Sequence, residues 1–214
     1  MKNTLSCIIP VKNGTKYLAE CLESIKLQSK KIDQLIIVDD HSTDDLENFV
    51  IEMNLDCIFV KSPSHGHAAA MNCGLRQVKT ELISFLDCDD IWTPNHVATL
   101  IKFFESDNSI DLAYGRVENV DENLKSINVS EVSRMLGSSI FHRRVFELNE
   151  HFDESLQHGS NIDFMVRIFA RKINFVKVDD VVLLRRIHAT NMGREKSIAR
   201  QSLFQVIRKN RIRS

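Results

Sequence analysis

The chain has 214 residues, of which 43% are hydrophobic and 27% charged, a balance typical of one globular domain with enough apolar side chains for a core. Its 28 lysine and arginine residues nearly match its 29 aspartate and glutamate residues, so the formal net charge of -1 gives no reason to expect a nucleic-acid partner. We find no secretory h-region and no apolar run of about 18 residues, so we expect a soluble, cytoplasmic protein.

Short apolar runs alternate with amphipathic segments through the first half of the chain. In order, we expect a strand at 5–11, a helix at 15–29, a strand at 34–40, a helix at 41–53, a strand at 56–62, a helix at 66–78, a strand at 81–87 and a helix at 93–106. This alternation predicts an α/β sheet with right-handed crossovers. In such sheets the ligand crevice lies beyond the carboxyl ends of the strands.

The second half is less regular. In order, we expect a strand and turn from 112–121, a stretch at 138–148 without a clear pattern, a helix at 160–172 and one or two strands at 174–188. The segment 194–214 carries seven lysine and arginine residues against one glutamate. A helix packed on the domain explains it, and so does contact with an anionic membrane surface or a partner helix.

Three aspartates in four positions close the predicted strand at 81–87. A strand's two-residue period would point Asp87 and Asp89 the same way, and two carboxylates that share a site need a cation or a proton between them. Oxygen ligands suit Mg²⁺ or Mn²⁺. The alternative is a solvated acidic turn, with Asp90 as the anion at the start of the next helix. We favour a cation site, because other polar clusters also end predicted strands.

Two such clusters lie at the ends of the first two strands. The first is Pro-Val-Lys-Asn at 10–13, and the second is the pair Asp39 and Asp40. A carboxylate at a sheet end can accept the imide N–H of uracil or thymine, or a ribose hydroxyl. Helix capping would explain residues 42–44, but it explains Asp40 poorly.

The last constellation is Arg186-Ile-His188. An arginine can bind phosphate oxygens with two hydrogen bonds, and a neutral histidine can ligate a metal. The alternative is a strand end whose charges are solvated. The other histidines lack ligand spacing with one another, and we expect them to be structural or solvated: His41, His65, His67, His96, His142, His151 and His158.

Four segments together resemble the family 2 glycosyltransferases of the GT-A fold: CIIPVKNGTKYLAECLESIKLQS, LIIVDDHSTDD, GHAAAMNCGL and ISFLDCDDIWTPNHV. The resemblance covers about 5–115 well and 138–192 more weakly. It implies a GT-A-like α/β fold with a mixed, mostly parallel sheet flanked by helices, in a single domain over 1–214. Within that domain, a nucleotide-sugar-binding half would reach about 115, an acceptor-side half about 192, and a basic C-terminal helix would follow at 193–214.

The resemblance also implies roles for particular residues. The base and ribose would be held by Pro10, Val11, Asn13 and Asp40, and Asn72 would line the nucleotide site. Asp87 would hold the ribose or the metal, and Asp89 would ligate the Mn²⁺ or Mg²⁺ that bridges the diphosphate. Arg186 and His188 would meet the diphosphate and the metal.

The acceptor side departs from the family pattern. Inverting relatives present an acidic pair at the start of a helix, where one acid deprotonates the acceptor hydroxyl. In this sequence Ser160 and Asn161 occupy that place, and an amide has no useful basicity. Asp163 is therefore the predicted base, while Asn161 could orient an acceptor. The alternative for Asp163 is an acid that stabilises the first turn of a helix.

The predicted function is metal-dependent, inverting transfer of a hexosyl or similar group from a nucleoside diphosphate sugar. Uridine is the expected base, and the acceptor is an unidentified glycan, lipid-linked or protein molecule. A catalytically inactive relative that binds a sugar nucleotide or a protein is the main alternative, because of Asn161. A nucleotidyltransferase is less favoured, since PVKNGTKY lacks the glycines and cations that hold a triphosphate. Peripheral membrane contact through the basic C-terminus stays open.

Overall fold

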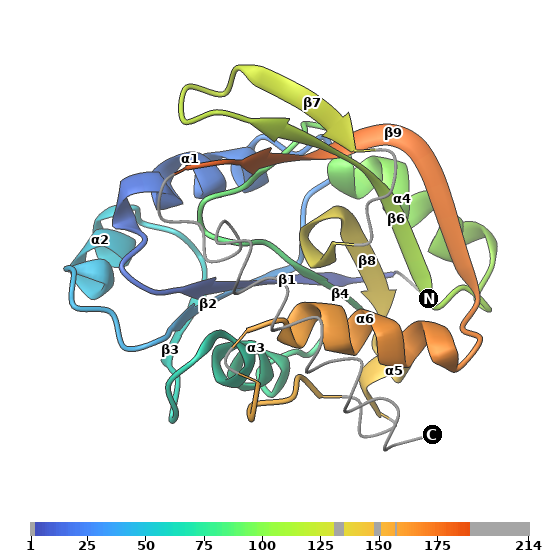
Figure 1. The fold of residues 1–214 in the computed structure, drawn as a ribbon, viewed down its shortest axis with the longest axis horizontal. Helices are drawn as coiled ribbons and strands as arrows, with labels where there is room; N and C mark the ends of the chain where they lie inside the picture. Colours follow the sequence, from blue (N-terminus) through green and yellow to red (C-terminus); the bar gives the residue numbers. More distant parts are fainter. Residues whose placement is uncertain (1–2, 131–134, 148–150, 157, 189–214) are drawn as a thin grey trace.

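The computed structural model describes residues 3–130, 135–147, 151–156 and 158–188. Within these ranges, nine strands form one sheet in the order β3-β2-β1-β4-β8-β6-β9-β5, with β7 paired to β6 (Figure 1). The strands are β1 (Leu5–Val11), β2 (Gln34–Asp39), β3 (Ile58–Lys61), β4 (Leu82–Phe85), β5 (Ile91–Trp92), β6 (Leu112–Val120), β7 (Ser126–Ser130), β8 (Ser139–His142) and β9 (Phe175–Arg186). The predicted basic helix at 193–214 lies outside the described residues.

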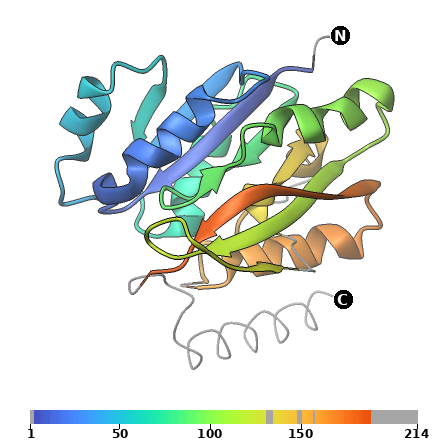
Figure 2. The same cartoon turned by 90° about the horizontal axis from the view of Figure 1, so that it is seen from above.

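Helices cover both faces of the sheet (Figures 1 and 2). They are α1 (Thr15–Lys26), α2 (Leu46–Glu52), α3 (His67–Leu75), α4 (His96–Ser106), α5 (Arg144–Glu147) and α6 (Ser160–Ala170), with a short 3-10 helix η1 (Leu136–Ser138). The apolar residues of α1, α2 and α4 share one core cluster, and those of α3, α5 and α6 share another. No helix in the described part of the chain combines the length and apolarity needed to cross a bilayer.

The strand directions confirm the mixed, mostly parallel sheet. β1 is parallel to β2 and β4, and β2 to β3. β8 lies between β4 and β6 and is antiparallel to both, so β6 runs in the direction of β4, and β9 is parallel to β6. Only the described strands β5, β7 and β8 run the other way. The carboxyl ends of six strands therefore share one edge of the sheet.

The continuous apolar run of β1 has a simple physical reason. Side chains alternate between the two faces of a strand, and both faces of this sheet carry helices. Cys7 and Ile9 accordingly pack with α1 and α4, while Ile8 packs against α3 on the opposite face. At Gly74 of α3, an added Cβ would overlap the side chain of Ile8, so this glycine lets the helix approach the strand closely.

The acidic segment after β4 forms a turn, whereas the sequence predicted that the strand continued to residue 87. β4 ends at Phe85, and the Asp90 N–H donates to the Asp87 carbonyl oxygen at 3.0 Å. The residues that follow form β5, whose pairing with β9 keeps the backbone extended. For this reason α4 begins at His96 and not at 93. The aspartates are therefore oriented by a turn, and the two-residue period of a strand does not apply to them.

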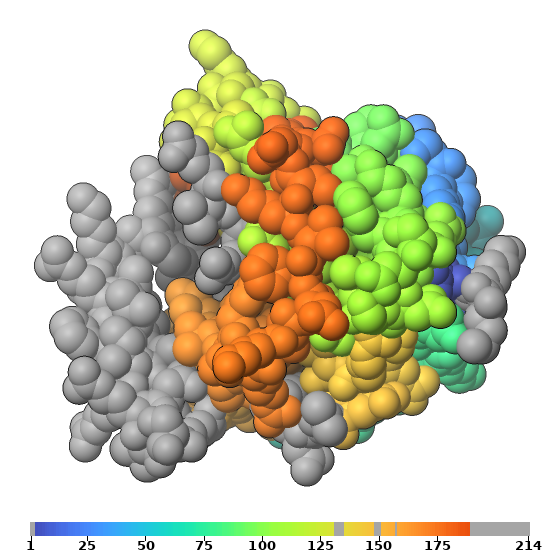
Figure 3. All heavy atoms as spheres, turned by 90° about the vertical axis from the view of Figure 1, so that its right-hand side faces the viewer, coloured from blue at the N-terminus to red at the C-terminus, as the bar shows by residue number. Residues whose placement is uncertain are grey.

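Boundaries of other elements also differ from the sequence prediction. α1 ends at Lys26 and not at 29. α2 begins at Leu46 and not at 41, because the Thr43 N–H donates to the side chain of Asn13 and does not open the helix. In the segment 174–188, where one or two strands were predicted, the structure has one long strand, β9, which joins β6 on one side and β5 on the other. The first residues of β9 lie at the surface beside α4 (Figure 3).

Candidate active site at the carboxyl edge of the sheet

The turn after β4 brings three carboxylates together. One oxygen from each of Asp87, Asp89 and Asp90 lies within 4.8 Å of the others. The three aspartates become more buried along the turn. The side chain of Asp87 is 44% exposed, that of Asp89 is 23% exposed, and Asp90 is 3% exposed as a whole. The cluster therefore opens to solvent on the side of Asp87.

The electrostatics of this cluster favour a cation. Burial, followed by the charge of Asp87, raises the pKa of Asp89. Burial and the charges of both neighbours raise the pKa of Asp90 well above its ordinary value. Burial also acts to raise the pKa of Asp87, but the hydrogen bond and charge of His67, with the charge of Arg185, lower it overall. For Asp89 and Asp90, the repulsion between neighbouring carboxylates would be relieved by a bound divalent cation.

Two histidines that are far apart in the sequence contact the cluster. The His188 Nε2 lies 2.8 Å from Asp89 Oδ2, and the His67 Nε2 lies 3.3 Å from Asp87 Oδ1. The structure therefore brings together Asp87, Asp89 and His188, as the sequence prediction requires. His67 was expected to be structural or solvated. Its place in the first turn of a helix that begins at the carboxyl edge was the signal for this contact.

The donor set fits the cation implied by the sequence. Carboxylate oxygens with one imidazole suit Mn²⁺ or Mg²⁺, and the three carboxylates lie close enough to share one ion. Asp89 and His188 would be ligands, and the more exposed Asp87 would face the bound donor. Asp90 has a different place, since its Oδ1 accepts the backbone N–H of Arg186 at 3.0 Å.

Arg186 holds the surroundings of the cluster together. Its guanidinium is buried and donates from Nε to the Asp89 carbonyl oxygen at 3.1 Å and from Nη1 to the Glu122 carbonyl oxygen at 2.8 Å. Nη2 donates to the carboxylate of Glu20, and the group lies 4.7 Å from the centre of the Tyr17 ring. These donors point at protein groups, so the predicted contact with a diphosphate stays a prediction.

The ends of β1 and β2 form the neighbouring part of the edge. The Asp40 N–H donates to the Val11 carbonyl oxygen at 2.8 Å, and Asp40 Oδ1 accepts the Gly66 N–H at 2.7 Å. Asn13 has a positive φ of 52° and accepts the Thr43 N–H at 2.6 Å, which ties the loop after β1 to the loop after β2. The structure therefore brings Val11, Asn13 and Asp40 together. Pro10, the fourth predicted residue, is buried in β1 one position before Val11.

Asn72 lies on α3 and is 6% exposed. Its Nδ2 donates to the Phe152 carbonyl oxygen at 2.9 Å and to Glu154 Oε1 at 2.8 Å, while its Oδ1 accepts the Phe152 N–H at 2.9 Å. The amide thus fixes the segment that leads to α6. Its predicted place in the lining of the nucleotide site stays a prediction, since these bonds are made within the protein.

The start of α6 lies at the same edge, because α6 leads into β9, which runs parallel to the main strands (Figure 1). Asp163 is fully buried, and its Oδ2 accepts Arg167 Nε at 2.8 Å. The Oδ1 of Asn161 is buried and has no hydrogen-bond partner among the described residues. The predicted base therefore lies inside an ion pair, and the amide beside it has an unused acceptor.

The mostly parallel sheet, with the aspartate turn and the polar strand ends at its carboxyl edge, has the architecture of the GT-A fold. Among solved structures, the chain is similar to S. aureus TarS 1–349 in complex with UDP, with a TM-score of 0.77 and 19% identity over 96% of this chain and 63% of that one. It is also similar to the mannosyltransferase PcManGT from Pyrobaculum calidifontis in complex with GDP-Man and Mn²⁺, with a TM-score of 0.75 and 19% identity over 98% and 64%. Both similarities confirm the GT-A fold.

The chain belongs to Glycosyl transferase family 2, whose family pattern matches residues 6–183. It is 26% identical over 206 residues to an uncharacterised glycosyltransferase of Rickettsia prowazekii (strain Madrid E), covering 86% of this chain and 64% of the relative. It is 32% identical over 126 residues to the glycosyltransferase GlyG of Streptococcus pneumoniae serotype 4, covering 57% and 42%. The chain spans less than two thirds of the length of these relatives.

Proposed function

We propose that the chain transfers a sugar from a nucleoside diphosphate sugar, with a divalent cation and with inversion at the anomeric carbon. The observation that carries the proposal is the meeting of Asp87, Asp89 and His188 at the carboxyl edge, beside the polar strand ends that include Asp40. The similar structures named above hold UDP, and GDP-Man with Mn²⁺, which supports a nucleotide-sugar donor. Uridine is the proposed base.

Different residues would bind different parts of the donor. Asp40 Oδ1 accepts the Gly66 N–H, whereas its second oxygen lies 3.9 Å from Lys12 Nζ, beyond hydrogen-bond distance. That second oxygen can accept the imide N–H of a base or a ribose hydroxyl. Asp89 and His188 would hold Mn²⁺ or Mg²⁺, which when bound would neutralise charge on the departing diphosphate. Asp89 is kept in place by the Arg186 guanidinium, which binds its carbonyl oxygen.

The acceptor side sets the requirement for catalysis. Inverting transfer needs a group that accepts the proton of the attacking hydroxyl. Asp163 remains the proposed base, and to act it must release Arg167 and become accessible, since it is now fully buried. Asn161 Oδ1 is also buried and has no partner among the described residues, so the same movement would have to expose it before it could accept a hydrogen bond from the acceptor hydroxyl.

A second candidate function rests on the same observation. A buried Asp163 paired with Arg167, beside an amide where relatives have an acid, is also what a binding protein without turnover would have. Such a protein would still bind the nucleotide and the cation. Binding and turnover therefore have to be measured separately.

The test is calorimetric titration of the whole chain with UDP and with GDP, each with and without Mn²⁺. We expect one nucleotide to bind only with Mn²⁺, and Asp89→Asn to lose that binding while Asp179→Asn, at an exposed position of β9, keeps it. No binding of either nucleotide in the presence of Mn²⁺ would refute a donor site. Release of UDP from UDP-sugars, measured next, separates a transferase from a binding protein.

A further inference from the structure

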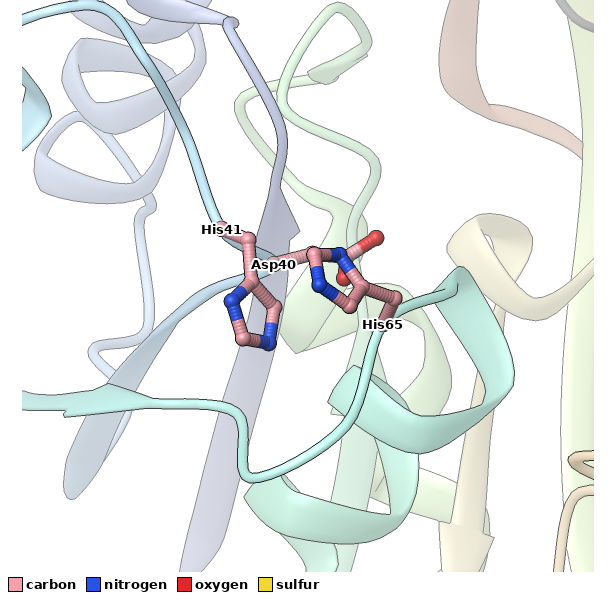
Figure 4. A group of neighbouring side chains, drawn as sticks. All are labelled: Asp40, His41 and His65. Atoms are coloured by element: carbon pink, nitrogen blue, oxygen red, sulfur yellow. The ribbon is translucent and has the colours of Figure 1, made fainter.

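A second group of potential metal ligands lies at the carboxyl edge, apart from the aspartate turn. One ligand atom from each of Asp40, His41 and His65 lies within 4.8 Å of the others. Figure 4 shows the two imidazole rings next to each other, with the Asp40 carboxylate close by. The ring centroids are 3.7 Å apart and the ring planes make an angle of 21°. Two histidines and a carboxylate are a common ligand set for Zn²⁺ and similar cations.

The backbone holds these side chains in position. His41 follows β2 with a positive φ of 56°, which is uncommon for a residue other than glycine and carries a conformational cost. The loop that carries His65 is fixed to the end of β2, because the Gly66 N–H donates to Asp40 Oδ1. β2 and β3 are adjacent parallel strands, so both histidines emerge at the same edge. Their approach is therefore built by the fold.

The Asp40 carboxylate is buried and fixed, whereas the two imidazole rings are exposed and free to rotate toward an ion. Asp40 is 4% exposed, whereas His41 and His65 are exposed. Stacked rings direct their nitrogen lone pairs side by side, so each ring must turn about its Cβ–Cγ bond to share one ion. Because both rings are exposed, they can turn without disturbing the core. Lys12 Nζ, 3.9 Å from Asp40 and on a half-exposed side chain, can move aside.

We infer that Asp40, His41 and His65 form a binding site for a cation of borderline softness such as Zn²⁺. This site differs in chemistry from the aspartate turn. It offers two imidazoles with one carboxylate, and the turn offers mainly carboxylate oxygens, which suit Mn²⁺ or Mg²⁺. A three-residue ligand set also leaves a coordination position open to water.

The two sites are joined by three consecutive residues. His65 belongs to the histidine pair, Gly66 binds Asp40, and His67 lies 3.3 Å from Asp87 of the aspartate turn. Gly66 has a φ of 109°, a conformation that other residues rarely adopt. The ion would occupy the oxygen of Asp40 that the proposed function gives to the donor. We therefore expect Zn²⁺ at this site to compete with the nucleotide, a consequence that rests on the proposed function.

The site is tested by calorimetric titration of the whole chain with Zn²⁺ alone. His65→Gln should weaken Zn²⁺ binding at least about tenfold. Mutation of a residue that only supports a metal ligand already lowers metal affinity by about this factor, and loss of the ligand itself should lower it at least as much. Asp89→Asn should keep this binding, and His151→Gln, an exposed histidine elsewhere, should resemble the wild type. Unaltered Zn²⁺ affinity in His65→Gln, or Zn²⁺ binding that only Asp89→Asn removes, would overturn the inference. Urea unfolding of His65→Gln should match the wild type.

Competition is measured separately, by titrating UDP in the presence of Mn²⁺ with and without Zn²⁺. We expect Zn²⁺ to weaken UDP binding in the wild type and to have little effect in His65→Gln. UDP binding that Zn²⁺ leaves unchanged would refute the competition. If Zn²⁺ binds through His65 but no nucleotide binds at all, the metal site stands and the proposed function fails.

Discussion

Replacing Asp163 with asparagine separates a structural role from a role as general base. The carboxylate is fully buried and accepts Arg167 Nε at 2.8 Å, and the arginine side chain is itself only 13% exposed. Asparagine keeps the shape of the Asp163 side chain but removes the negative charge that pairs with the nearly buried guanidinium of Arg167. Loss of one member of a buried ion pair costs about 3–5 kcal/mol, a large part of the roughly 5–15 kcal/mol that stabilises an ordinary domain. We expect the free energy of unfolding to fall by at least about 3 kcal/mol.

Urea denaturation followed by circular dichroism measures this loss, with Asp179→Asn on the exposed side of β9 as the matched control. UDP binding with Mn²⁺ and release of UDP from UDP-sugars are then compared for folded protein. A variant that loses only the base keeps its stability and its nucleotide affinity while turnover stops. If Asp163→Asn unfolds at the wild-type urea concentration yet has no turnover, the inference of a structural ion pair from burial is wrong.

Three further variants test the packing and the electrostatics. Burial lowers the pKa of His96 from 6.5 to about 3, so below pH 6.5 only the unfolded chain takes up this proton and stability falls as the pH falls, by up to about 1.4 kcal/mol per pH unit. His96→Asn should flatten this slope in urea denaturation series between pH 6.5 and pH 4, and an unchanged slope would contradict the assignment. Gly74→Ala should cost about 1–3 kcal/mol in thermal unfolding, because its Cβ would overlap Ile8, and an unaltered Tm would refute the close packing. Arg186→Lys should weaken Mn²⁺ binding about 10–100-fold, since lysine cannot make the forked contacts that place Asp89, and equal affinity in titration would count against that role.

The main strands of the sheet could be predicted because each of them is encoded by a short, continuous stretch of sequence. Continuous apolar runs between amphipathic segments indicated parallel strands buried on both faces, and β1, β2, β3 and β4 lie where those runs predicted them. The turn at Asp87 was not predictable in this way. It depends on β5 pairing with β9, a contact between residues far apart in the chain that no local pattern reveals.

The candidate site was predictable in part for a related reason. The position of polar residues after predicted strands indicated that Asp40, Asp87 and Asp89 would share an edge, and the structure places them at that edge. The partners of a long side chain are set by tertiary structure. The arginine of the Arg186-Ile-His188 motif therefore looked available for phosphate, although its guanidinium lies against Glu122 and other protein groups.

The contact between Asp89 and His188 spans 99 positions of the chain, and this has a consequence for how the protein is made. During synthesis the aspartates leave the ribosome long before β9 exists, and contacts between distant residues form late because chain closure must precede them. Until β9 arrives, the side of β6 that it will cover is an unpaired strand edge, the kind of surface that invites aggregation. The arrival of one strand closes that edge and also delivers Arg186 and His188 to the aspartates. Nascent chains that stop before residue 175 therefore contain Asp87, Asp89 and Asp90 but leave the edge of β6 unpaired. We expect these chains to depend on a chaperone more than the full chain does.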